Sequence, residues 1–297
     1  MKIEFTILIL SVFMFGLQAN ATKVLLLTGQ TDPYHNWEVT SSYLKATLDH
    51  QAIFETDVLL IPSEEEMDTF SLDFSKYQVV VLDQNGPDWP DKVQKNFADY
   101  VYNGGGVVIV HEANNAFPDW KEYNQICGLG GWKGRNEKSG PYLYWKEGKA
   151  VKDYSPGKGG SHGKRVLYVV NIRDSEHPIT KGLPMKWLHQ NDELYGNLRG
   201  PAENIHVLAT AYSDSASNGT GKEELVLFTV TYGKGRVFHT VMGHTHADFC
   251  DSVQDVGFQV TFSRGTEWAA TGKVKQELPA EFPTETQVLL RELSQLK

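Results

Sequence analysis

Short apolar runs alternate with amphipathic segments along the first half of the chain. The apolar runs occupy residues 24–28, 56–61, 78–82 and 107–110. Two segments have the apolar spacing of helices, at residues 37–48 and 91–102. Runs that are apolar without alternation are typical of parallel strands covered by helices on both faces. The pattern therefore predicts an α/β fold with a doubly wound, mostly parallel sheet.

This architecture also predicts where a ligand would lie. In open α/β sheets, ligands gather beyond the carboxyl ends of the strands. Here those ends lead into the loops at residues 29–35, 83–89 and 111–117. Side chains in these loops are the first candidates for a functional site.

The pattern changes between residues 128 and 163, where Gly, Lys, Trp and Tyr dominate and little periodicity remains. We interpret this stretch as a Gly/Trp-rich insertion or lid without regular structure, with poor order as the alternative. Strand patterns then return at residues 166–172, 207–212, 225–232 and 237–242. Glycines at 233–236 predict a tight hairpin turn, and the spacing at 254–270 predicts a closing helix.

The two ends of the chain differ from the part between them. Lys2, the apolar run at 5–17 and the sequence Ala19-Asn20-Ala21 have the order of an export signal. The run is shorter than the about 20 apolar residues that a bilayer requires, although a buried strand or a retained anchor is the alternative.

The resulting domain prediction has three parts: a signal peptide at 1–21, a domain at 22–271 and a charged tail at 272–297. In the tail, residues 286–296 have the composition of a docking helix. The mature protein would be periplasmic or secreted, without a membrane anchor.

Charge and cysteine content exclude several classes of function. The formal net charge of −9 repels phosphate groups, so we expect no binding to nucleic acid or anionic membranes. Cys127 and Cys250 are the only two cysteines, and their spacing excludes a disulfide framework or a cysteine-rich zinc site. They form either one bridge or two separate thiols.

His111 and Glu112 follow the apolar run at 107–110 directly, where the sheet would meet a ligand. An imidazole in this place can act as an acid, a base or a metal ligand. Capping of a following helix is the structural alternative. Serine-hydrolase, Walker and dinucleotide-binding motifs are absent from the sequence, and no cysteine occupies this turn.

A second group of histidines lies near the other end of the domain, at His239, His244 and His246. Together with His111 and with His162 from the glycine-rich stretch, they are candidate ligands for a divalent metal such as zinc. Their spacing matches no standard metal motif such as HExxH. Hydrogen bonds to an organic ligand and purely structural roles are the alternatives.

Paired carboxylates form a third group. Asp192 and Glu193 lie between His189 and Tyr195 in a polar segment. Two adjacent carboxyl groups can divide the roles of acid and base, or bind sugar hydroxyls. A solvated loop is the alternative.

The order of these segments resembles proteins of the ThuA-like (trehalose utilisation) family. The resemblance covers residues 23–270 and is carried by five blocks, at 108–114, 117–120, 174–184, 192–195 and 232–244. It implies a flavodoxin-like fold similar to class I glutamine amidotransferases, without their nucleophilic cysteine. It also implies a role in the use of trehalose and related disaccharides through keto-sugar intermediates.

Carried over residue by residue, the resemblance places His111, Asp192, Glu193 and His244 on positions of the family's motifs. The chain departs from the family's pattern after residues 120–127, where a Gly-His pair is usual. Gly130-Gly-Trp132 stands there instead, and His162 comes only after the insertion.

These observations predict an exported enzyme that acts on a keto-sugar or a related glycoside. We expect catalytic roles for five residues: His111, Glu112, Asp192, Glu193 and His244. We expect four others to contact the substrate: Trp120, Trp132, His162 and Tyr195.

The expected partner is a small carbohydrate, and the chain can also form a homo-oligomer. The alternative function is a non-catalytic sugar-binding domain, with tryptophans such as Trp89 as stacking platforms. Convergence of several histidines with a carboxylate would favour the enzyme.

Overall fold

A computed structural model describes residues 21–29, 34–247 and 249–296 of the chain. Except for Ala21, the proposed signal peptide lies outside these residues. In the described part of the chain, no helix is long and apolar enough to cross a membrane.

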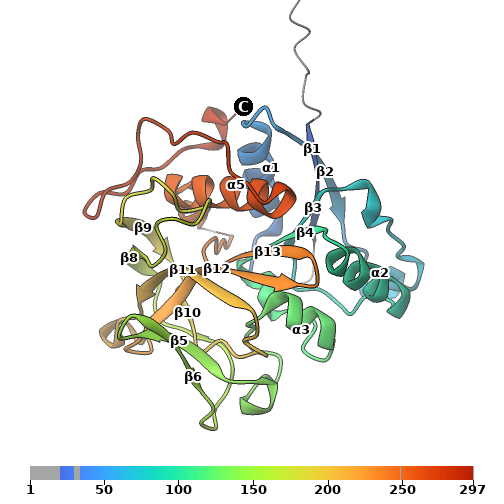
Figure 1. The fold of residues 1–297 in the computed structure, drawn as a ribbon, viewed down its shortest axis with the longest axis horizontal. Helices are drawn as coiled ribbons and strands as arrows, with labels where there is room; N and C mark the ends of the chain where they lie inside the picture. The colour runs from blue at the N-terminus through green and yellow to red at the C-terminus, as the bar shows by residue number, and fades with distance from the viewer. Residues whose placement is uncertain (1–20, 30–33, 248, 297) are drawn as a thin grey trace, which may run out of the picture.

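One mixed sheet forms the centre of the fold (Figure 1). Neighbouring parallel strands follow one another in the order β2 (Phe54–Leu60), β1 (Thr22–Thr28), β3 (Val79–Asp83), β4 (Gly106–Val110) and β13 (Gly235–Thr240). Antiparallel strands continue the sheet in the order β12 (Glu223–Tyr232), β11 (Ile205–Tyr212), β8 (Val166–Ile172) and β9 (Lys186–Asp192). In the centre, Val108 lies opposite Val81 on one side and Phe238 on the other.

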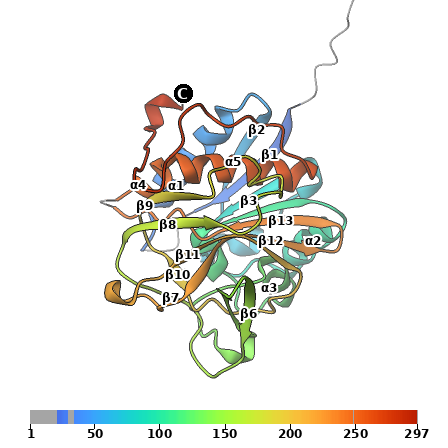
Figure 2. The same ribbon diagram turned by 60° about the vertical axis from the view of Figure 1, so that its left-hand side comes forward.

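Helices cover both faces of the parallel half (Figure 2). One face carries α1 (Trp37–Asp49), α4 (Asp251–Gln254) and α5 (Val256–Thr271), and the other carries α2 (Asp91–Tyr102) and α3 (Lys121–Cys127). Every residue of β3 and β4 is buried between these layers. Strands in this position have no solvent-facing side, which is why their sequences lack alternation.

Side-chain caps fix where α1 and α5 begin. Asn36 Oδ1 accepts a hydrogen bond from Val39 N at 3.3 Å, and Asp255 Oδ1 accepts one from Phe258 N at 3.0 Å. Such caps satisfy backbone donors that have no partner within the helix. Asp255 thereby separates α4 from α5, and the closing helix predicted at 254–270 forms as α5.

The structure confirms the predicted α/β fold class and most of its elements. Helix α2 and strand β8 have the bounds that the sequence pattern gave. The predicted turn at 233–236 joins β12 to β13.

The prediction that residues 128–163 lack regular structure is wrong. Strands β5 (Tyr142–Lys146) and β6 (Lys149–Asp153) form a hairpin, and β5 extends the sheet from β12. A second small sheet pairs β7 (Ser161–His162) with β10 (Tyr195–Gly196). The turn residues Glu147 and Gly148 have φ of 51° and 79°, which a tight hairpin requires, but Glu-Gly is a weaker signal than Asn-Gly.

The predicted docking helix at 286–296 is also wrong, since only one 3₁₀ turn forms there, at Leu293–Gln295. The tail instead bonds through its backbone to the domain. Leu188 N donates to Thr284 O at 2.7 Å, and Arg291 N donates to Gln254 O at 2.8 Å. These bonds cover β9 and the junction of α4 with α5, so the tail packs as part of the domain.

Candidate functional site

A cleft of about 1250 Å³ opens beyond the carboxyl ends of the parallel strands. The loops after β1, β2, β3 and β13 line it, together with the insertion. Its volume lies above the roughly 300–1,000 Å³ that is usual for clefts that bind small molecules, so a small organic ligand has ample room. The predicted position of the ligand therefore coincides with this cleft.

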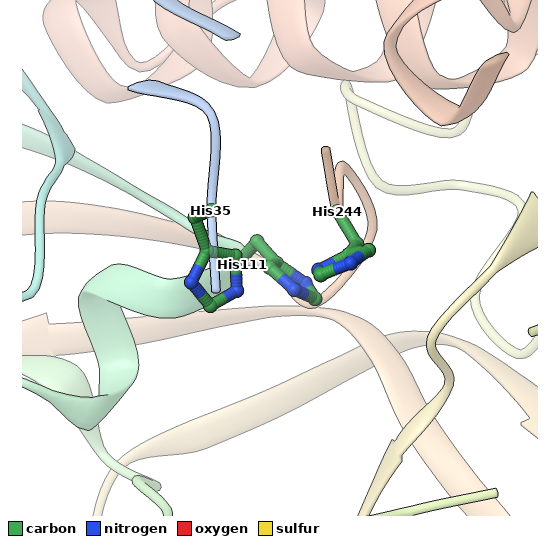
Figure 3. A group of neighbouring side chains, drawn as sticks. All are labelled: His35, His111 and His244. Atoms are coloured by element: carbon green, nitrogen blue, oxygen red, sulfur yellow. The ribbon is translucent and has the colours of Figure 1, made fainter. Parts of the chain in front are cut away.

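Three histidines converge at the base of this cleft (Figure 3). His35 follows β1, His111 follows β4 and His244 follows β13. Their ring centroids are 4.9 to 5.3 Å apart, and one ring nitrogen of each lies within 4.8 Å of the other two. We call these residues the histidine trio.

The backbone and a carbonyl group fix the position of His111. Its φ is 41°, a left-handed conformation that costs energy for a residue with a Cβ. Nδ1 lies 2.6 Å from Val241 O, which can only accept, so Nδ1 carries the proton. Nε2 is left as an acceptor, and it has no hydrogen-bond partner.

A buried carboxylate orients His35. Nδ1 of His35 lies 2.9 Å from Glu112 Oε2, and Nε2 lies 3.3 Å from the Tyr195 hydroxyl. The carboxylate lies at ion-pair distance from the ring and limits how it can turn. Glu112, predicted as catalytic, therefore stands behind a member of the trio, as the orienting partners of metal-bound histidines do.

Asp192 anchors the loop that carries His244. Its carboxylate accepts from Gly243 N at 2.9 Å, His244 N at 3.1 Å and Glu193 N at 2.7 Å, and it lies 2.9 Å from His189 Nε2. The side chain is fully buried and does not line the cleft. The predicted catalytic contact of Asp192 with a ligand is therefore corrected to a positioning role.

Glu193 points into the cleft. Its Oε2 lies 3.5 Å from His244 Nδ1 and 3.7 Å from His162 Nε2. Burial raises the pKa of the Glu193 carboxyl, although His162 opposes the shift. Such a carboxyl is nearer than usual to accepting a proton at neutral pH.

Two members of the trio, His111 and His244, are held in the neutral form. Burial, with contributions from the other histidines, lowers the pKa of His111 well below its ordinary value and that of His244 to about 3. Neutral imidazole is the form that binds metal ions, and three protein ligands with an open position are typical of catalytic zinc sites. The donor set and its outer partners therefore fit a divalent metal.

Aromatic rings form one wall beside the trio. The Tyr195 ring lies 4.1 Å from that of His111 and 4.6 Å from that of Trp132. Trp132 and His162 also line the cleft. Three of the four predicted substrate contacts are therefore placed where a ligand can reach them.

Trp120 and His239 lie elsewhere, which corrects two predicted site positions. Trp120 packs on Phe117 and Trp89 in the core at 5.3 and 5.9 Å, so neither tryptophan can stack on a ligand. His239 is buried within β13, and its Nδ1 forms a hydrogen bond with Cys127 O at 3.1 Å. Strand alternation separates it from the loop that carries His244.

The remaining metal candidates lie at the rim. His162 and His246 line the cleft but do not belong to the trio. His35 was missed, because a lone histidine in a loop of turn residues has no local motif. Its only signal was its place in the loop at 29–35, which the sheet argument had marked.

No cysteine lines the cleft in the part of the chain that the structure describes. Cys127 and Cys250 are separate free thiols, and burial raises the pKa of Cys127 to about 12. A buried neutral thiol is a poor nucleophile.

The fold defines an α/β protein of the class I glutamine amidotransferase-like type, in which His111 and not a cysteine follows β4. The chain belongs to the ThuA family, described as trehalose utilisation, whose match spans residues 23–269.

Solved structures agree with this assignment. A ThuA-like protein from Parabacteroides merdae is 54% identical, with a TM-score of 0.88 over 92% of this chain and 98% of that one. A ThuA-like protein from Bacteroides uniformis is 18% identical, with a TM-score of 0.53 over 87% of this chain and 94% of that one. A cytoplasmic protein from Salmonella typhimurium LT2, 14% identical with a TM-score of 0.50 over 84% and 99% of the two chains, shares the fold. A comparison with curated proteins finds no match.

Proposed function

We propose that this protein is an exported enzyme that uses a divalent metal ion, held by the histidine trio, to process a keto-sugar or a related glycoside. The observation that carries the proposal is the convergence of His35, His111 and His244 with Glu193 in one cleft. A domain that only binds sugar needs hydrogen-bond donors and aromatic platforms, but not three imidazoles whose ring nitrogens converge.

The trio would hold the metal ion, with Glu112 and the Val241 carbonyl orienting two of the rings. Bound there, a divalent metal supplies Lewis-acid polarisation of a substrate carbonyl. A keto group acidifies the proton on the neighbouring carbon, so one base is enough to begin elimination or isomerisation.

Glu193 is the residue placed to take that proton. Its carboxylate faces the cleft beside His244, and burial moves its pKa toward neutrality. His162, 3.7 Å away, can pass a proton between Glu193 and solvent. Trp132 and Tyr195 would hold the sugar ring by stacking.

Metal analysis combined with turnover of 3-keto-glycosides tests the proposal. The purified protein should contain about one divalent ion per chain, and His35→Ala, His111→Ala and His244→Ala should each lose the ion and at least about 100-fold in rate. His50→Ala is the matched control, because His50 is exposed at the end of α1. Folded trio variants that kept the parent's rate would end the proposal.

A sugar-binding function without catalysis is the second candidate, favoured by the aromatic wall of Trp132 and Tyr195. It predicts calorimetric binding of glycosides by a protein that turns none of them over.

The proposed export is tested separately, by the mass of the mature protein, which should begin near Thr22.

A further inference from the structure

Arg165 is a cation at the rim of the cleft, exposed and stacked on an aromatic ring. It lies on the segment between β7 and β8, and its side chain lines the cleft. Within the described residues, no hydrogen bond or ion pair is formed by its guanidinium group, which lies 4.5 Å over the Phe249 ring. The face of the guanidinium is therefore occupied, while its N–H edge is available.

The loop that carries His244 holds this arrangement in place. His246 and Phe249 exchange backbone hydrogen bonds, with N–O distances of 2.8 and 3.0 Å. The bonds fix Phe249 beside the trio, at 6.4 Å between its ring centroid and that of His244. Stacking on an aromatic ring limits the freedom of an arginine and so lowers the entropy cost of binding through it.

Charge is unevenly distributed in the cleft. Arg165, His162 and His246 line the part next to the antiparallel strands, where Glu193 is the carboxylate among them. Three carboxylates line the part next to the parallel strands: Glu64 and Asp68 from the loop after β2, and Asp88 from the loop after β3. A ligand that spans the trio therefore meets a cation at one end and hydroxyl-binding carboxylates at the other.

We propose that Arg165 forms an anion subsite and that the natural substrate is an acidic glycoside, with its carboxylate on the guanidinium and its hydroxyls toward the acidic loops. This inference rests on the proposed function and names its substrate class. Guanidinium and carboxylate match in shape and bond through two parallel N–H···O contacts. The chain's net charge of −9 does not oppose this locally, because charges beyond about 10 Å are screened at 0.1 M salt.

Calorimetric titration of the whole protein with two ligands of equal size tests the subsite. Methyl β-D-glucuronide and methyl β-D-glucoside differ in the carboxylate alone. The parent should bind the glucuronide at least about tenfold more tightly, as expected for charge-assisted hydrogen bonds. Arg165→Gln should bring the two affinities within about twofold by weakening glucuronide binding alone, and Arg165→Lys should keep part of the preference.

Lys164→Gln is the control, because it removes the same charge from the neighbouring residue, which does not line the cleft. It should leave the preference unchanged. Equal affinity of the parent for both glycosides, or a preference that survives in Arg165→Gln, overturns the subsite and leaves the proposed function standing. Binding of neither glycoside also overturns the subsite, whereas the proposed function is decided separately by the metal content and by turnover of 3-keto-glycosides.

Discussion

The histidine trio and the buried His189 lie close to the loop that carries His244, and they hold protons in opposite ways. In the histidine trio, burial lowers the pKa of His111 and His244, and one nitrogen of each ring lies within 4.8 Å of the others. His189 is buried as completely, but Nε2 lies 2.9 Å from Asp192 and Nδ1 lies 3.2 Å from Asp255. We call His189 with these two residues the aspartate clamp.

The clamp shows that burial alone does not decide the charge of a histidine. Burial lowers the pKa of His189, but the two aspartates more than offset this and raise it to about 9. A protonated ring with both N–H groups bonded to carboxylates has no lone pair for a metal. The clamp is therefore structural and the trio is suited to ligands, while Asp192 joins them through the backbone of Gly243 and His244.

Among these predictions, replacing His189 should change the free energy of unfolding most. His189→Ala leaves two buried aspartates facing each other, and loss of one partner in a buried ion pair costs about 3–5 kcal/mol. Denaturant unfolding measures the loss. His206→Ala is the control, because His206 forms an exposed pair with Asp174 that should contribute below about 1 kcal/mol. Equal losses in both variants would show that the clamp is not a charged pair.

Alkaline pH should weaken the clamp without a mutation. The pKa of His189 is about 9 in the folded chain, above the ordinary 6.5, so its contribution to stability is complete below pH 6.5. It is lost as pH rises through 9, by about 2 kcal/mol between pH 7 and pH 9. Unfolding midpoints across this range measure the loss. His189→Gln, which does not titrate, should lack this component; the same slope in both proteins would contradict the assignment.

Replacing Asp192, which contacts both the clamp and the loop of His244, should have the smallest effect. Asp192→Asn keeps the side-chain volume but places an amide against backbone N–H donors, so the loop at His244 should shift. We expect metal affinity to fall about tenfold, as it does when other outer-shell partners of metal ligands are replaced. Competition with a chelator measures this affinity. Asp255→Asn also weakens the clamp but does not contact that loop, so it should lower stability and leave metal affinity unchanged. Equal metal affinity in both variants would show that Asp192 does not position the trio.

The sequence predicted the parallel half of the fold well because its strands are buried on both faces. Strand β9 was missed because its buried positions include His189 and Asp192, whose burial depends on partners distant in the chain. Hydrophobic patterns cannot register such partners.

The site was predicted in part for a related reason. The ends of the predicted strands located the loops of the site, but they did not show where each side chain in those loops points. Adjacent residues at the end of a strand point to opposite sides. Asp192 and Glu193 therefore could not share one role, and only Glu193 faces the cleft.

The position of β13 has a consequence for how the protein comes to be active. This strand, near the end of the domain, lies between β4 and β12, so His111 and His244 meet only after segments about 130 residues apart have paired. Pairings this distant along the chain form slowly. We expect the proposed metal site to be among the last features to form. A growing or partly folded chain would then lack the site, and it would not bind an incorrect metal ion before folding is complete.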